Sequence, residues 1–279
     1  MKKLKVYCFI LCMILILLGG IGANMIFEVP KTSKLASGDN NLRCLDYKPT
    51  ASIDVSEPLH IGVWNIYKQR LDGWKHELLT LSQKASLILL QEAQSSSNLS
   101  DFVAVHGWHS NQAFAFAMNG KITGVMTLSD LVPQRVCAYT IIEPYLRLPK
   151  SALYSEFLLS NGRILTVINI HSINFTFGIE EYLEQLRALI EAVKVLQGPL
   201  IIAGDFNTWS ELRLQTIKTE LNTIGLQEAS FSPDIRLKFF GLPLDHVFYR
   251  ELILERASSK ETESSDHNMI VATFSFNNK

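Results

Sequence analysis

The chain has 279 residues, of which 47% are apolar and 19% are charged. This composition supports a sizeable buried core and excludes a disordered chain, a collagen repeat and a small disulfide-stapled scaffold. The 26 basic and 27 acidic residues give a formal net charge of −1. The chain therefore lacks the basic surplus that non-specific nucleic-acid binding requires. A nuclease is disfavoured by this balance, although bound cations could neutralise phosphate locally.

The N-terminal segment is apolar and uncharged from residue 6 to residue 27, and it follows Lys2, Lys3 and Lys5. Such a run is long enough to cross a bilayer as a helix. A Gly-Ile-Gly-Ala stretch within it could serve as the cleavage site of a signal peptide. The apolar run continues beyond that stretch, however, so we expect residues 1–27 to be an uncleaved membrane anchor. Secretion after cleavage is the alternative.

The charges on either side of this segment bear on its orientation. The lysines at the start favour a cytoplasmic N-terminus and therefore a body outside the cytoplasm. Lys31, Lys34 and Arg43 follow on the other side, so a body facing the cytoplasm stays an alternative. Cys44 and Cys137 could form a disulfide in an oxidising compartment, but cysteines so far apart in sequence are more often unpaired. We expect a monomer.

Residues 28–58 contain many turn formers and no sustained hydrophobic period. They are interpreted as a linker with one short ordered contact near Cys44. Residues 59–279 form the folded domain, in which strand-like and helix-like runs alternate. Strands are expected at 59–66, 85–93, 124–129, 163–172, 199–207, 244–250 and 268–276, and helices at 72–83, 179–197 and 209–221. This order predicts an α/β (α+β) body with strands packed in layers.

Two of the predicted helices carry specific signals. Asp72 is expected to cap the first helix. The helix at 179–197 is expected to cover a sheet with one apolar face and to end at Gly198-Pro199. That face comprises Ile179, Tyr182, Leu183, Leu186, Ile190 and Val193.

Polar residues that could carry chemistry follow many of the apolar strands. They are Asn65, Glu92, His171, Asp205, Asn207, Asp245, Asp266 and His267. Individually, residues of these types are most often caps and turn formers. A carboxylate at the rim of a buried sheet nevertheless needs a cationic partner, and the complete set suits metal-assisted phosphoester hydrolysis. His246, next to Asp245 on a strand, points to the opposite face and is expected to be structural.

The motifs of the chain resemble those of a known superfamily. They are WNI at 64–66, LLQE at 89–92, GVMTLS at 124–129, INIHS at 168–172, GDFN at 204–207, LDHV at 244–247 and SDH at 265–267. Their order resembles that of the endonuclease/exonuclease/phosphatase superfamily, and WNIYKQ, AGDFNTWS and PLDHVFYR resemble its YafD-like bacterial subgroup. This resemblance implies a DNase I-like four-layer sandwich, in which two mainly antiparallel β-sheets are flanked by helices.

The resemblance also implies a metal site. Glu92 would be the principal ligand, positioned by Asn65, and Asp266 would contribute to the same site. The implied cofactor is Mg²⁺, with Mn²⁺ as the alternative. Hard cations of this kind prefer a few oxygen ligands and retain several waters.

The remaining residues receive catalytic roles from the same resemblance. Asp205 and Asn207 would orient or deprotonate the attacking water and hold the phosphate. His267, paired with Asp245, would stabilise the transition state or protonate the leaving group. His171 would contact the phosphoryl oxygens. These roles agree with a reaction that depends on positioning and charge stabilisation.

We therefore predict a metal-dependent phosphoesterase, with a catalytically inactive membrane-tethered scaffold protein and a nuclease as alternatives. The residues after Glu92 include no arginine of the kind that DNase I-like enzymes use toward DNA, and Asp130 stands where many members carry a basic residue. These departures slightly favour a lipid headgroup or a small phosphoester over nucleic acid as the substrate. No apolar hairpin suited to lipid entry is evident in the sequence.

Overall fold

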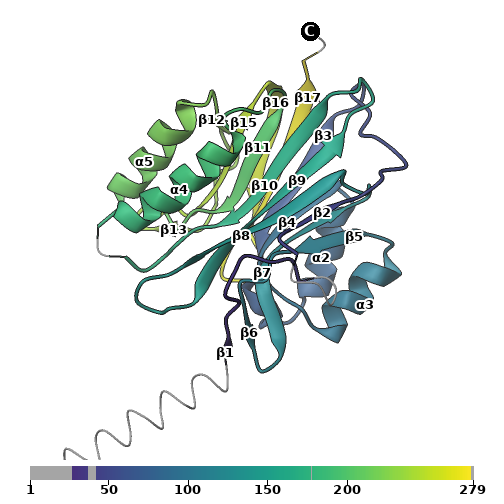
Figure 1. The fold of residues 1–279 in the computed structure, drawn as a ribbon. Coiled ribbons are helices and arrows are strands. Elements are labelled where there is room, and N and C mark those ends of the chain that lie inside the picture. Colours follow the sequence, from purple (N-terminus) through teal and green to yellow (C-terminus); the bar gives the residue numbers. More distant parts are fainter. Residues whose placement is uncertain (1–26, 37–41, 177, 278–279) are drawn as a thin grey trace, which may run out of the picture.

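Two β-sheets packed face to face form the centre of the molecule, with α-helices on both outer surfaces (Figure 1). This computed structural model describes residues 27–36, 42–176 and 178–277. The four-layer sandwich expected from the sequence motifs is confirmed. The expected membrane anchor lies outside the described residues except for Phe27, and none of the helices within them is long and apolar enough to cross a membrane.

The first sheet has the strand order β1-β6-β7-β4-β3-β17-β16, with β5 paired to β7. Its neighbours are antiparallel except for the parallel pair β3–β4. The strands are β1 (Phe27–Glu28), β3 (Leu59–Asn65), β4 (Leu87–Gln94), β5 (His109–Gln112), β6 (Phe116–Met118), β7 (Lys121–Ser129), β16 (Leu252–Lys260) and β17 (Met269–Phe276).

The second sheet has the order β12-β15-β11-β10-β9-β8-β2, and its one parallel pair is β10–β11. Its strands are β2 (Cys44–Asp46), β8 (Arg135–Ile142), β9 (Pro149–Leu158), β10 (Ile164–His171), β11 (Leu200–Asp205), β12 (Gln227–Glu228) and β15 (Asp245–Arg250). A separate hairpin pairs β13 (Lys238–Phe239) with β14 (Leu242–Pro243).

The helices are α2 (Trp74–Ser82), α3 (Ser97–Val105), α4 (Glu180–Val193) and α5 (Glu211–Asn222), with a short 3-10 turn η1 (Tyr67–Gln69). Helices α2 and α3 pack on the first sheet through a cluster that includes Trp64, Leu78 and Leu99. Helices α4 and α5 pack on the second sheet, where Leu186, Ile190 and Ile217 join residues of β10 and β11.

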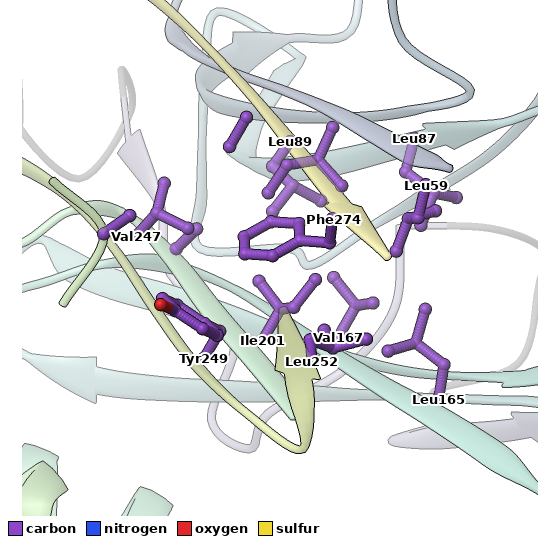
Figure 2. Close-up of a cluster of buried hydrophobic side chains, with 14 of the residues drawn as sticks. Leu59, Leu87, Leu89, Leu165, Val167, Ile201, Val247, Tyr249, Leu252 and Phe274 are labelled. Carbon is purple, nitrogen blue, oxygen red and sulfur yellow. The ribbon is translucent and has the colours of Figure 1, made fainter. Parts of the chain in front are cut away.

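The core between the sheets follows from the alternation of side chains along each strand. Residues Leu59, Ile61 and Val63 of β3 point toward the second sheet, and Ile201 and Ala203 of β11 point back toward the first. Figure 2 shows this cluster, with Phe274 between Leu89 and Ile201. The other faces of these strands pack under helices, so the central strands are apolar on both sides and read as continuous hydrophobic runs.

The apolar face predicted for α4 is confirmed for Tyr182, Leu186, Ile190 and Val193, which are buried. The other two predicted members, Ile179 and Leu183, are half-buried, and Ile179 precedes the helix. The helix ends at Val193, before Gly198-Pro199. The predicted cap of α2 is wrong. Gly73, whose φ is +84°, occupies the position before the helix, and no side chain caps it. Glycine adopts this left-handed conformation without steric cost, so the chain enters the helix through the turn that Gly73 makes.

The segment expected to be a linker contacts the body at several points. Leu35 is buried and forms a bridge with Ala113, and Ile53 forms one with Leu159. Strand β2 joins the edge of the second sheet, where Cys44 lies opposite Cys137 and forms a disulfide with it. The sequence left a disulfide open while favouring unpaired cysteines, and the structure contains the disulfide, because sheet pairing brings together two residues 93 positions apart.

Candidate functional site

The predicted site residues converge at one end of the sandwich. Asn65 and His171 end β3 and β10, Asp205 ends β11, and Asp245 begins β15. Glu92 lies in β4, and Asp266 and His267 lie in the loop that leads into β17. The parallel pairs β3–β4 and β10–β11 bring the carboxyl ends of four strands to the same edge. Residues from both sheets thus meet although they span most of the domain.

Asp205 lies at the centre of this arrangement. Its Oδ2 accepts a hydrogen bond from Asn65 Nδ2 at 3.0 Å, and it lies 3.4 Å from His171 Nε2 and 3.8 Å from His267 Nε2. Its Oδ1 accepts a hydrogen bond from the backbone N–H of Asn207 at 2.9 Å. Burial raises the pKa of Asp205 to about 6, although His267 opposes this shift. The carboxyl group is held in one orientation by fixed donors.

A glycine explains why the chain approaches so closely here. Gly204, directly before Asp205, has a φ of +145°, and a Cβ atom on it would lie 2.0 Å from the carbonyl oxygen of Ile170. Any side chain at this position would push β10 and β11 apart. The glycine of the GDFN motif is therefore required for the spacing between His171 and Asp205.

His267 and Asp245 form a buried pair. His267 Nδ1 donates to Asp245 Oδ2 at 2.8 Å. Burial lowers the pKa of His267, but Asp245 and Asp205 outweigh this effect and raise it to about 10. The imidazole is therefore charged at neutral pH. Ser265 helps to place it, because its Oγ accepts from the backbone N–H of His267 and donates to the carbonyl oxygen of Asn65 at 2.6 Å.

His171 has the opposite electrostatic character. It is buried, and its pKa is lowered well below the usual range by burial and by the nearby cations Lys150 and Lys68. Lys150 Nζ donates to its Nε2 at 2.8 Å. Loss of solvent lowers the pKa of Lys150 as well, an effect partly offset by Glu92 and Asp205. The site therefore contains one neutral and one charged imidazole.

Glu92 reaches the site because β4 is irregular there. The register of β4 with β7 shifts between Leu90 and Ala93, and Glu92 has a φ of +52°. A bulge of this kind redirects a side chain from its regular alternation. Its carboxylate forms an ion pair with Lys68, which belongs to η1 just after Asn65. Glu92 is only partly buried, so its oxygens face the cleft.

Asn207 and Asp266 occupy the margins of the site. Asn207 is buried, has a φ of +49°, and donates from Nδ2 to the carbonyl oxygen of Ser172 at 2.9 Å. Asp266 is exposed, and its Oδ1 lies 3.3 Å from Ser265 Oγ. Its charge contributes to the raised pKa of His267. Asp266 thus faces solvent beside the buried pair.

The donor atoms suit a hard divalent cation. Ligand atoms of Asp205, Asp245 and His267 lie within 4.8 Å of one another. Among the described residues, none donates a hydrogen bond to the buried Oδ1 of Asp245. His267 is charged and has no lone pair to offer, so carboxylate and amide oxygens are the suitable ligands. Glu92 supplies carboxylate oxygens on the wall of the neighbouring cavity.

A cavity of about 220 Å³ opens beside these groups. Its polar wall is formed by Lys68, Glu92, Lys150 and His171, and its apolar wall by Phe116, Leu146, Leu148 and Phe175. The two lysines were not identified from the sequence. Lys68 lies three residues after Asn65, which was a usable signal, whereas nothing local distinguishes Lys150 at the start of β9.

The prediction for His246 is consistent with the structure. His246 is buried away from the cleft, where its Nδ1 lies 2.6 Å from Glu228 Oε1 and its Nε2 lies 2.7 Å from Thr208 Oγ1. It is structural, as expected.

A polar connection between the sheets was not expected: Gln91 Nε2 donates to Asn169 Oδ1 at 2.8 Å, and Asn169 Nδ2 donates to the carbonyl oxygens of Leu90 and Met126.

Comparison with known proteins agrees with this geometry. The model of the Endonuclease/Exonuclease/phosphatase family matches residues 62–267. A UPF0294 protein of Vibrio vulnificus is 46% identical over 263 residues, covering 92% of this chain and 93% of the relative.

Solved structures show the same fold at low identity. The endonuclease/exonuclease/phosphatase from Bacteroides vulgatus superposes with a TM-score of 0.62 at 15% identity, covering 79% of this chain and 100% of the other. A 3′ phosphatase from Neisseria bound to a product DNA hairpin has a TM-score of 0.55 at 19% identity, covering 77% and 98%. With the family match across most of the domain, the chain belongs to the endonuclease/exonuclease/phosphatase family, among the relatives named UPF0294.

Proposed function

We propose that this protein is a hydrolase that uses a divalent metal ion, Mg²⁺ or alternatively Mn²⁺, to cleave a phosphoester with water. The observation that carries the proposal is the buried chain of contacts from Asn65 through Asp205 to His267 and Asp245. Family members are metal-dependent phosphoesterases or nucleases. A scaffold protein would have no need to retain two buried carboxylates and a charged imidazole, whose desolvation is unfavourable.

The residues divide the proton transfers between them. Asp205 accepts a proton from the attacking water, in an orientation set by Asn65 and the backbone of Asn207. The water oxygen bonds to phosphorus, and the bond from phosphorus to the leaving oxygen breaks. His267 gives the Nε2 proton to that oxygen, while Asp245 holds Nδ1. Asp205 thus gains one proton and His267 loses one, and proton exchange with solvent returns both side chains to their starting states.

The cations of the site would stabilise the phosphoryl group. Lys150 and the neutral His171 face the cavity, where an anionic oxygen would meet a donor. Glu92, with Asn65 and Asp266, is the set that we propose to hold the metal. A bound divalent ion would neutralise charge that develops on the phosphoryl oxygens. Glu92 would then exchange Lys68 for the metal, which leaves the Lys68 ammonium beside the phosphate.

We also propose a location and a substrate class. The disulfide between Cys44 and Cys137 supports a body outside the cytoplasm, because disulfides persist in oxidising compartments. With residues 1–27 as an anchor, the catalytic domain would lie at a membrane surface. A lipid headgroup or a small phosphoester is favoured over nucleic acid as the substrate. The Neisseria 3′ phosphatase of similar fold, by contrast, was solved with a product DNA hairpin.

The test is a substrate panel assayed with Mg²⁺ and with EDTA: plasmid DNA, RNA, sphingomyelin vesicles and inositol phosphates. Asp205→Ala and His267→Ala should each lower turnover by roughly two orders of magnitude while the protein stays folded. Hydrolysis that survives both substitutions would overturn the proposal. DNA nicking lost in Asp205→Ala would support the nuclease alternative instead.

Metal binding separates the enzyme from the scaffold alternative. Titration calorimetry with Mg²⁺ alone should detect weak binding to the wild-type chain and none to Glu92→Gln. Glu77→Gln is a matched control, because Glu77 lies in α2 and pairs with Lys260 away from the site. Equal heats for wild type and Glu92→Gln would contradict the metal assignment.

A further inference from the structure

Exposed apolar side chains surround the outer edge of the substrate cavity. Ile142, the last residue of β8, is 49% exposed, and Tyr145 and Leu146 in the turn before β9 are 53% and 55% exposed. The loop after β10 carries Phe175, which is 53% exposed. Leu146 and Phe175 line the cavity. We call these four residues the apolar lip. These exposed apolar side chains were not evident from the sequence.

The two loops of the apolar lip are tied together. The side chain of Glu143 is buried beneath them, and its Oε1 accepts hydrogen bonds from the backbone N–H groups of Asn174 at 2.7 Å and Phe175 at 2.8 Å. A buried carboxylate that joins two loops fixes their relative position. The apolar lip is thus a built surface of the fold, since its two parts share one internal anchor.

The N-terminal strand enters the body beside this surface. Strand β1 pairs with β6, and the ring of Phe27 packs edge-on against that of Phe116, with 6.1 Å between centroids. Phe116 lines the same cavity as Leu146 and Phe175. Figure 1 places β1 and the turn between β8 and β9 at the same end of the sandwich, opposite to the C-terminus. The uncharged apolar sequence of residues 6–26 therefore joins the body at the mouth of the site.

We infer that the apolar lip is a docking surface for a lipid bilayer and that the cavity opens toward the membrane. Clustered exposed apolar side chains mark interaction surfaces. Tyr145 next to Leu146 and the exposed Arg147 matches the composition of membrane interfaces, where aromatic and cationic groups lie at the level of the headgroups. The apolar sequence that ends at Phe27 selects the bilayer over another protein as the occupant.

This docking would set the orientation of the domain. The anchor proposed for residues 1–27 would raise the concentration of the body at the membrane, so weak contacts of the apolar lip would suffice to hold one face against the bilayer. Substrate phosphates at headgroup level would then face Lys68 and Lys150 across the cavity. The surface itself does not depend on the proposed chemistry, and its test requires no substrate or turnover.

The experiment measures contact with lipid directly. The full chain is reconstituted into vesicles of phosphatidylcholine and phosphatidylglycerol, with or without bromine on the acyl chains. Leu146→Trp and Phe175→Trp should each lose fluorescence to brominated lipid, with bromine near the headgroup quenching more than bromine deep in the chain. Interfacial groups enter the bilayer by only about 5–10 Å.

Val195→Trp is the matched control. Val195 is an apolar residue with 71% exposure that follows α4. Val195 lies toward the end of the sandwich that is opposite to the site. Its neighbour Leu196 accepts a hydrogen bond from Arg250, and Arg250 is the strand partner of Leu200, at the end of β11 opposite to Asp205. This reporter should show no quenching beyond that of the wild-type tryptophans. Equal quenching of the reporters on the apolar lip and of Val195→Trp would overturn the inference.

A second variant separates lipid from protein as the occupant. Adding Tyr145→Asp and Leu146→Asp to the Phe175→Trp reporter should abolish its quenching while circular dichroism and melting stay unchanged, because both positions are more than half exposed. Quenching that persists would contradict the inference. A reporter that shifts to the blue without quenching, with a larger mass by ultracentrifugation, would assign the surface to a protein partner and overturn it.

Discussion

His267 Nδ1 lies 2.8 Å from Asp245 Oδ2, and this hydrogen bond joins the two sheets at the end of the sandwich that holds the candidate site. His267 precedes β17 of the first sheet, whereas Asp245 begins β15 of the second. The contact between Asn65 and Asp205 crosses between the sheets in the same way. The site therefore exists only while the sheets hold their relative position, which links its geometry to the packing of the core.

Asp245→Asn should remove the charge that keeps His267 protonated. We expect the pKa of His267, raised to about 10 in the native protein, to fall when followed by NMR titration. Turnover with Mg²⁺ should drop by roughly two orders of magnitude because the imidazole loses its orientation and its proton. Asp46→Asn is the control, since Asp46 is exposed on β2. An unchanged His267 titration would contradict the assigned pairing.

Lys150→Met should weaken catalysis without unfolding the protein. The substitution keeps the length of the side chain but removes the ammonium that donates to His171, so kcat/KM should fall by about 10- to 100-fold. Methionine avoids the cost of desolvating a charge, so the melting temperature should not decrease. Lys121→Met is the control, because it makes the same substitution at an exposed lysine on β7. Equal activity of the two variants would exclude a role for Lys150 in turnover.

The contact between Glu228 and the buried His246 predicts that the stability of the protein depends on pH. Burial acts to raise the pKa of Glu228, but hydrogen bonding to His246 and the charge of Lys218 outweigh it and lower the pKa from 4.5 to about 2. A carboxyl group with a depressed pKa in the folded state stabilises the protein above its unfolded pKa, and this contribution is lost as the pH falls toward the folded value. The loss should occur between about pH 4.5 and pH 2.

Glu228→Gln should remove this dependence. At pH 7 we expect the free energy of unfolding to fall by on the order of 2 kcal/mol. The difference from wild type should shrink as the pH is lowered through that window, as measured by urea unfolding at several pH values. Glu220→Gln is the control, because it removes a carboxylate that pairs with Arg187 on the surface. A constant difference at every pH would disprove the assigned coupling.

The disulfide should contribute measurably to stability. Cys44 and Cys137 close a loop of 93 residues, for which the chain-entropy model predicts about 4.6 kcal/mol. Replacing both cysteines with alanine should lower the melting temperature, and dithiothreitol should lower that of the wild type but not that of the double variant. Catalysis should persist well below the melting transition, because β2 and β8 lie at the edge of the sheet away from Asp205.

Much of the site was predictable because its residues follow apolar strands. The run LILLQ before Glu92 and the run LIIAG before Asp205 have the composition of buried strands. Carboxylates at such positions indicate function, since burial otherwise disfavours them. The face of α4 was predictable for a similar reason, as Leu186 and Ile190 recur with helical spacing.

Other features depended on contacts between residues distant in sequence. Lys150 resembles any lysine at the start of a strand until β9 brings it beside His171. The disulfide required β2 to pair with β8, and the cap of α2 depended on the backbone of Gly73. None of these leaves a periodic signal in the local sequence.

The amino-acid sequence predicted helices α2, α4 and α5, strands such as β3, β4 and β11, and the polar groups that follow those strands, because periodicity and strand ends are local properties. It did not predict α3, β8, β9 or β16. The tertiary structure alone decided which of those groups meet, which lysines face them, and where the apolar lip lies. The physical reason is that the two sheets pack through nondirectional burial of apolar side chains. Their relative placement, and with it every contact from Asn65 to Asp205 and from Asp245 to His267, emerges only when the whole core has formed.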